Sequence, residues 1–243
     1  MRLTRRSLLV VVTAVAATAR PAWADDARKG ERSFGKPDAK VTVQEFFSLT
    51  CTHCAAFSQN TMPDLTRNLI DTGKLRFVYH DFPLDQVALL AAQVARALPP
   101  ERYEPFIAAL FASQDRWAFA RGINYTDEIW KFAALAGMSR TTFDSAVADT
   151  DLRSWILAQQ EADQKNYGID STPSFLINGQ KYSGDMSYDA FVKLIPAVYK
   201  GSRLARPLPP PAHCRLQEFR RTGQRRDPPR HDRHRRPQRL RQV

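Results

Sequence analysis

The sequence predicts an α/β fold, in which a mixed sheet carries helices and a long helical block is inserted between the two halves of the sheet. Two observations lead to this prediction. Near the N-terminus, two β-branched and aromatic stretches are separated by a helical pattern. Near the C-terminus, two short β-rich stretches are joined by an Asn-Gly pair and followed by a last helical pattern.

The N-terminal half of the sheet is predicted from residues 40–47 and 75–79, which are rich in β-branched and aromatic side chains. From Cys51 onward, apolar residues recur at near-helical spacing, so a helix is expected between the two strands. Pro63 falls inside this pattern. Because proline lacks a backbone N–H, we expect a kink there.

The middle of the chain, residues 85–167, reads as helical throughout. Ala-rich amphipathic runs are separated by Pro99, Pro100, Gly122 and Gly137, which are residues that end helices. This block is interpreted as an inserted helical domain.

The C-terminal half of the sheet is predicted from residues 171–182, where Asn178 and Gly179 form a hairpin turn between two short strands. A helix is expected over residues 187–199. The predicted organisation is therefore a polar, loose lead, one sheet-containing domain in two pieces and the insertion between them, at residues 25–39, 40–84 with 168–200, and 85–167.

The net charge of +11 is concentrated at the two ends of the chain. Residues 1–24 carry four arginines and no acid, and residues 201–243 carry thirteen arginines against three acids. The remainder, residues 25–200, is left with a charge of −3. A mildly acidic body gives no reason to expect a nucleic-acid partner.

Residues 1–24 have the pattern of a signal peptide that directs export to the periplasm. A positively charged start precedes an apolar run, residues 8–17, that is too short to span a bilayer, and small residues suit cleavage after Ala24. The adjacent Arg5 and Arg6 also resemble a twin-arginine signal, so both export routes stay open.

Residues 201–243 are rich in arginine and proline and too poor in apolar residues to build a core, which predicts a disordered tail. Sequence of this kind is what GC-rich DNA yields out of frame. We therefore interpret the tail as the product of a reading-frame change. Its Cys214 fits that view, because an unpaired thiol in an oxidising compartment invites wrong disulfides. The alternative is a genuine basic tail that holds the protein near anionic membranes.

The chemistry is predicted to reside in Cys51-Thr52-His53-Cys54, where a strand gives way to a helix. A cysteine at a helix N-terminus faces unpaired N–H groups and the positive end of the helix dipole, which favour the reactive thiolate. We expect Cys51 to be exposed and to attack, and Cys54 to be buried and to resolve the mixed disulfide. His53 lies between them and can stabilise a thiolate.

Taken alone, this cysteine pair has other readings: a zinc half-site, a structural disulfide or chance. A zinc site needs two further ligands, and His80 is the nearest candidate without a second Cys or His pair beside it. The position between strand and helix favours redox chemistry, and no metal is expected.

Two further features support that interpretation. Glu45 interrupts an apolar strand six residues before Cys51. If its side chain is buried, it could accept and return a proton beside the thiols. The alternative is that the alternation of side chains along the strand turns Glu45 toward solvent. Thr172 and Pro173 precede another apolar strand, where a cis bond would turn the backbone sharply and a trans proline would simply lie in a loop.

Residues 43–54, which contain Glu45, the Phe-Phe-Ser string and both cysteines, closely resemble the active-site segment of DsbA-type thiol–disulfide oxidoreductases. Residues 77–84 and 171–179 also resemble segments of this family, and the likeness covers residues 35–200. The resemblance implies a thioredoxin-like fold with an inserted helical domain. It also implies that Pro173 is cis beside Cys51, and that Thr172 offers backbone hydrogen bonds to a substrate strand.

The same resemblance implies an exported oxidase that introduces disulfide bonds into reduced proteins without a cofactor and is reoxidised by a membrane partner. We expect a monomer. The alternatives to an oxidase are a disulfide isomerase, a client-specific reductase or a non-enzymatic binder of anionic surfaces or nucleic acid through the basic tail. Related isomerases carry an N-terminal oligomerisation segment, and residues 25–39 are short for one.

Overall fold

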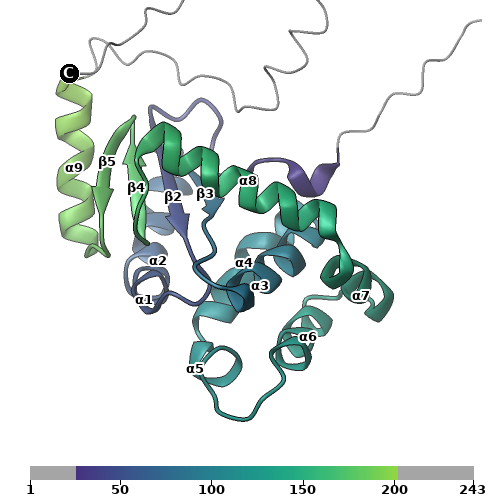
Figure 1. The fold of residues 1–243 in the computed structure, drawn as a ribbon. Coiled ribbons are helices and arrows are strands. Elements are labelled where there is room, and N and C mark those ends of the chain that lie inside the picture. The colour runs from purple at the N-terminus through teal and green to yellow at the C-terminus, as the bar shows by residue number, and fades with distance from the viewer. Residues whose placement is uncertain (1–25, 202–243) are drawn as a thin grey trace, which may run out of the picture.

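The computed structural model describes the backbone of residues 26–201 and the side chains of residues 26–195 (Figure 1). The predicted signal peptide, Cys214 and the tail beyond Gly201 lie outside this range. No helix within the described part of the chain is long and apolar enough to cross a membrane.

A five-stranded mixed sheet forms the centre of the fold, in the order β1-β3-β2-β4-β5. The pair β2–β3 is parallel, and the other neighbouring pairs are antiparallel. The predicted mixed sheet is therefore confirmed. Its strands are β1 (Arg32–Phe34), β2 (Val41–Phe47), β3 (Leu75–Asp81), β4 (Ser174–Ile177) and β5 (Gln180–Ser183).

The N-terminal lead is not loose, so that expectation was wrong. It contains a short 3-10 helix, η1 (Ala27–Lys29), and the edge strand β1, which pairs with β3. The ring of Phe34 packs against Phe77 and Tyr79, and the buried guanidinium of Arg32 donates to the Ala27 carbonyl. The ring contacts of half-buried Phe34 and the hydrogen bond of Arg32 offset the entropy of ordering the segment.

The helix after β2 is broken where a kink was expected. The segments are α1 (Thr52–Asn60), α2 (Met62–Leu65) and a π-helical turn, η2 (Thr66–Ile70). Pro63 stands in the first turn of α2, where its missing N–H costs no helical hydrogen bond. Proline thus starts a new helix here and does not bend a continuous one.

The middle of the chain is helical, as the sequence predicted, and forms six helices, of which the one-turn helix α5 was not predicted. Each amphipathic run predicted there falls on one of them. They are α3 (Gln86–Ala97), α4 (Pro100–Phe111), α5 (Gln114–Trp117), α6 (Tyr125–Leu135), α7 (Arg140–Ala148) and α8 (Thr150–Tyr167).

The two faces of the sheet have different covers. Phe57 of α1 and Phe191 of α9 (Tyr188–Gly201) pack with Phe175 of β4 on one face. Helix α8 crosses the other face (Figure 1), where its Tyr167 contacts Phe46. Because side chains alternate along a strand, Glu45 of β2 points away from α8 and toward the α1 side.

Candidate active site

Cys51 is the N-cap of α1, four residues after the end of β2. Its backbone is extended (φ −84°, ψ 119°), and its Sγ accepts the backbone N–H of Cys54 at 3.3 Å. A sulfur in this position replaces the oxygen that usually caps a helix, so the orphan N–H groups of the first turn point at it.

The two sulfurs differ in burial, although Cys51 is less exposed than predicted. Cys51 retains 9% of its accessible surface and Cys54 none. The expectation of an exposed Cys51 was wrong in degree, because capping turns its side chain in toward the helix and toward the loop before β4. The expected ranking holds, and only Cys51 can be reached from solvent.

The two thiols also differ in acidity. The hydrogen bond with Cys54 is the largest influence on Cys51; together with the Thr172 side chain and the N–H groups of Cys54 and His53, it outweighs burial and lowers the pKa of Cys51 to about 5. Burial, followed by the hydrogen bond with Cys51 and the charge of Glu45, raises the pKa of Cys54 well above its ordinary value. At neutral pH, Cys51 is a thiolate and Cys54 a thiol.

The Thr172–Pro173 peptide bond is cis, and the Thr172 carbonyl oxygen lies 3.4 Å from the Cys51 sulfur. The structure therefore brings this loop beside Cys51, in the place that the resemblance implied. Thr172 Oγ1 is buried without a hydrogen bond of good geometry. It nevertheless lies near enough to the sulfur to contribute to the lowered pKa of Cys51.

Glu45 is buried, with 3% of its surface exposed, and it forms no ion pair with any described residue. Burial, and then the nearby Cys51 charge, raises the pKa of this carboxyl well above its ordinary value. A carboxyl that is protonated in the interior can give a proton to a nearby thiolate and recover it later. The alternative solvent-facing orientation is thereby excluded.

His53 extends outward, with 70% of its side chain exposed, and its Nδ1 lies 3.2 Å from Asp185 Oδ1. Sequence reasoning missed Asp185, which lies in the loop between β5 and α9 far along the chain. No motif marks it, since only the tertiary fold brings that loop to the cysteines.

Gln114 is a second residue that the sequence did not reveal. Its side-chain amide donates hydrogen bonds to the carbonyl oxygens of Leu49, at 2.7 Å, and Cys51, at 3.0 Å. The residue belongs to the one-turn helix α5 and is 6% exposed. An isolated polar residue within a helical block carries no sequence signal for such a role.

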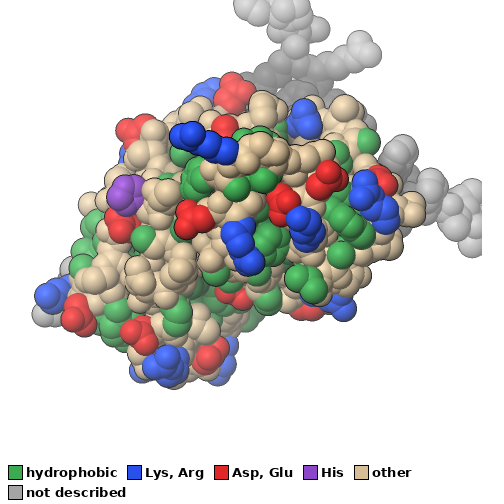
Figure 2. All heavy atoms as spheres, turned by 90° about the horizontal axis from the view of Figure 1, so that it is seen from below, with side chains coloured by type: hydrophobic (Ala, Val, Ile, Leu, Met, Phe, Trp, Pro, Cys, Tyr) green, Lys and Arg blue, Asp and Glu red, His purple; other side chains and the backbone are tan. Residues whose placement is uncertain are grey.

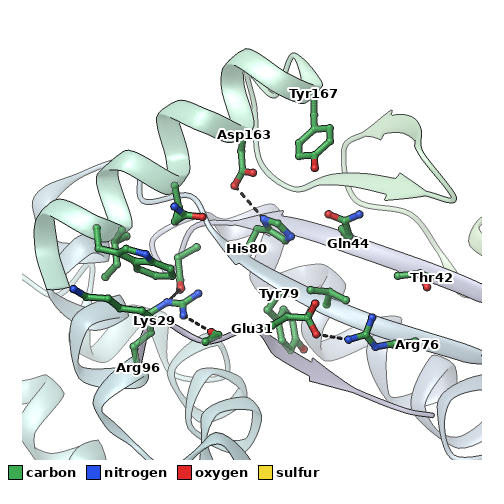
Figure 3. A pocket seen from close by; sticks show the side chains of 16 residues that line it. Lys29, Glu31, Thr42, Gln44, Arg76, Tyr79, His80, Arg96, Asp163 and Tyr167 are labelled. Carbon is green, nitrogen blue, oxygen red and sulfur yellow. Dashed lines mark hydrogen bonds and ion pairs between the residues drawn. The ribbon is translucent and has the colours of Figure 1, made fainter. Parts of the chain in front are cut away.

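His80 lies on the opposite face of the sheet, in a cavity of about 300 Å³ beneath α8. Figure 3 shows it joined to Asp163, with Gln44 and Tyr167 nearby; the His80 Nδ1 to Asp163 Oδ2 distance is 3.1 Å. The sheet thus separates His80 from the cysteines. Among the residues that the structure describes, no three His, Cys, Asp or Glu side chains gather in a way that could hold a metal ion.

Charged side chains of both signs are interspersed over the face seen from below (Figure 2). This distribution agrees with the mildly acidic body derived from the composition.

Comparisons with known proteins place the chain in a family. The family model described as "Thioredoxin" matches residues 27–197. The thiol:disulfide interchange protein DsbA of Pectobacterium carotovorum is 29% identical over 65% of this chain and 78% of its own length. The crystal structure of Wolbachia pipientis alpha-DsbA1 superposes with a TM-score of 0.66 at 28% identity, covering 71% of this chain and 92% of that structure.

A protein of Rickettsia conorii named as a protein-disulfide oxidoreductase is 28% identical over 64% of this chain. The match covers 55% of that protein, so the chain spans about half the length of such relatives. The sequence, the fold and the cysteine pair nevertheless point to the same group of proteins.

Proposed function

The chain belongs to the thioredoxin family, and on this premise we propose that it is an exported DsbA-type thiol–disulfide oxidoreductase that introduces disulfide bonds into folding proteins. The observation that carries the proposal is the contrast between its two sulfurs. Cys51 caps α1 as a stabilised thiolate, whereas Cys54 is fully buried and protonated. Stabilising the thiolate stabilises the reduced form, which makes the disulfide a strong oxidant.

In the first step, a substrate thiolate attacks Cys51 Sγ of the oxidised pair. The S–S bond breaks, and its electron pair goes to Cys54 as the leaving sulfur. Because the pKa of Cys54 is raised, this sulfur takes up a proton, and Glu45 is the buried carboxyl placed to supply it. Glu45 then recovers a proton from solvent.

In the second step, another substrate thiolate attacks the substrate sulfur of the mixed disulfide. Cys51 leaves readily as a thiolate because its pKa is low. The substrate dithiol has lost two electrons and formed a disulfide, and the cysteine pair has gained them. His53 can stabilise the Cys51 thiolate, and the loop at Thr172 and Pro173 would dock the substrate backbone.

The setting of this activity is part of the proposal. The signal-peptide pattern of residues 1–24 supports export to the periplasm, where folding proteins require disulfides. The sulfurs carry the electrons, so no cofactor takes part in the exchange. A membrane partner would reoxidise the pair, and the substrates would be reduced exported proteins.

Cysteine variants test the mechanism. Cys51→Ser removes the attacking thiolate and should abolish oxidation of a dithiol peptide. Cys54→Ser should instead accumulate mixed disulfides with reduced proteins, visible on non-reducing gels. Full turnover by Cys54→Ser would contradict the dithiol mechanism.

A redox titration of the wild type against glutathione separates the oxidase from its alternatives. A reduction potential of about −120 mV is expected for a strong oxidase, whereas about −270 mV would indicate a thioredoxin-like reductant. Assays of insulin reduction and of refolding of a scrambled disulfide protein complete the comparison. High activity in either of them without dithiol oxidation would favour the reductase or the isomerase.

A further inference from the structure

We propose that Gln114 is a positioning residue through which the helical insertion holds Cys51 in the geometry that stabilises its thiolate. This inference deepens the proposed function and rests on it. Gln114 does not touch the reacting sulfurs. It acts through the backbone on both sides of Thr50, at the turn that leads into α1.

Gln114 contacts this turn at two points, and this pair of hydrogen bonds is called the clamp below. Gln114 Nε2 donates to the carbonyls of Leu49 and Cys51, at 2.7 and 3.0 Å, and so spans the turn. The Cys51 carbonyl also accepts the N–H of Ala55 at 3.1 Å, which is the first hydrogen bond of α1. The amide therefore fixes the peptide plane that follows Cys51 and, with it, the direction of the N-cap.

The clamp is firmly anchored in the insertion. Helix α5 carries Trp117, which is fully buried and donates from its indole to the Leu110 carbonyl at 2.7 Å. This contact ties α5 to the end of α4. Gln114 itself is 6% exposed, so water does not readily replace its hydrogen bonds.

The clamp matters more to the reduced form than to the oxidised form. A Cys51–Cys54 disulfide ties Cys51 covalently to the first turn of α1. Without that bond, the sulfur keeps its hydrogen bond from the Cys54 N–H, at 3.3 Å, only while Cys51 stays in the N-cap conformation. Loss of the amide should therefore destabilise the thiolate, raise its pKa and weaken the disulfide as an oxidant.

Two variants and one control test this role. Gln114→Met keeps the length of the side chain and removes the donor, and Gln114→Glu keeps its shape while turning a carboxylate toward two carbonyl oxygens. The matched control is Gln93→Met. Gln93 is likewise buried in the insertion, and its Nε2 also donates to two carbonyls, those of Ala146 and Asp149, each at 3.0 Å.

Thiolate absorbance against pH and a glutathione titration are measured for all four proteins, and each variant is checked for folding by near-UV circular dichroism. For Gln114→Met we expect the thiolate midpoint to rise by about half to one pH unit, and the glutathione equilibrium to shift about three- to tenfold toward the oxidised form. Gln114→Glu should shift the thiolate midpoint and the glutathione equilibrium further. Gln93→Met should lower stability to urea but leave the midpoint and the equilibrium unchanged.

The outcomes separate this inference from the proposed function. A low wild-type midpoint that Gln114→Met and Gln114→Glu leave in place would overturn the positioning role alone. Equal shifts in Gln93→Met and Gln114→Met would also overturn it, because the effect would then be general loosening. A wild-type midpoint near about 8.5 would instead overturn the proposed function.

Discussion

Two carboxyl groups are buried on neighbouring strands of the sheet, and their surroundings are opposite. Asp81 of β3, 5% exposed, forms an ion pair with the guanidinium of Arg96 and accepts a hydrogen bond from the Tyr103 hydroxyl at 2.8 Å. Glu45 of β2, 3% exposed, has no charged partner among the described residues and faces the cysteines.

The difference shows that one buried carboxyl group stabilises the fold and the other is available for chemistry. Arg96 belongs to α3 and Tyr103 to α4, so the partners of Asp81 join the sheet to the insertion. The ion pair with Arg96 and the hydrogen bond from Tyr103 hold the two parts together. Glu45 lacks such a partner, and the raised pKa that results keeps its proton available to Cys54.

The largest effect should come from breaking the paired site. Arg96→Met leaves Asp81 buried without a counter-charge and also removes donors to the carbonyls of Arg28 and Gly30. We expect the free energy of unfolding, measured in urea, to fall by about 3–5 kcal/mol. Dithiol oxidation by the protein that remains folded should be preserved, because Arg96 does not contact the cysteines.

Arg140→Met is the control for this variant. Arg140 pairs with Asp144, but both side chains are 55% exposed. Loss of the Arg140 guanidinium should therefore lower the free energy of unfolding by less than about 1 kcal/mol. If the two variants were equally destabilising, the buried pair would not be the element that joins the sheet to the insertion.

A smaller effect, opposite in sign, is expected at the unpaired site. The pKa of Glu45 is raised in the folded state, so its stabilising contribution is complete below the unfolded pKa of about 4.3 and is lost as pH rises toward the folded pKa. Reduced Glu45→Gln should lack this loss. It should therefore become more stable relative to the wild type as pH rises, by up to about 1.4 kcal/mol over one pH unit, as measured by urea unfolding at pH 5 and pH 6.

Glu45→Gln should slow turnover, although it is expected to raise stability. Because glutamine cannot carry the proton to Cys54, we expect Glu45→Gln to oxidise a dithiol peptide about ten- to a hundredfold more slowly. Glu104→Gln is the matched control, since burial also raises the pKa of Glu104 but its carboxyl is not among the main influences on the pKa of either cysteine. Equal slowing in both variants would refute a specific role for Glu45.

The contrast also explains how far the sequence could predict this site. Glu45 and the cysteines lie within ten residues on one strand–turn–helix unit, so their local pattern shows their arrangement. Tyr103, Gln114 and Asp185 come to their partners only through tertiary packing, and no local periodicity marks them. Strand β1 was missed for a related reason: at three residues, it is too short to show alternation, and its order comes from the rings of Phe77 and Tyr79.

The smallest effect is expected at the exposed contact between His53 and Asp185 beside the cysteines. His53 and Asp185 are 3.2 Å apart, but their side chains are 70% and 43% exposed, so solvent screens their interaction. Asp185→Asn should change the free energy of unfolding by at most a few tenths of a kcal/mol and the glutathione equilibrium by less than about threefold. Adding salt should reduce the second change further. A shift as large as that expected for Gln114→Glu would mean that this pair, although exposed, controls the Cys51 thiolate more strongly than the buried contacts do.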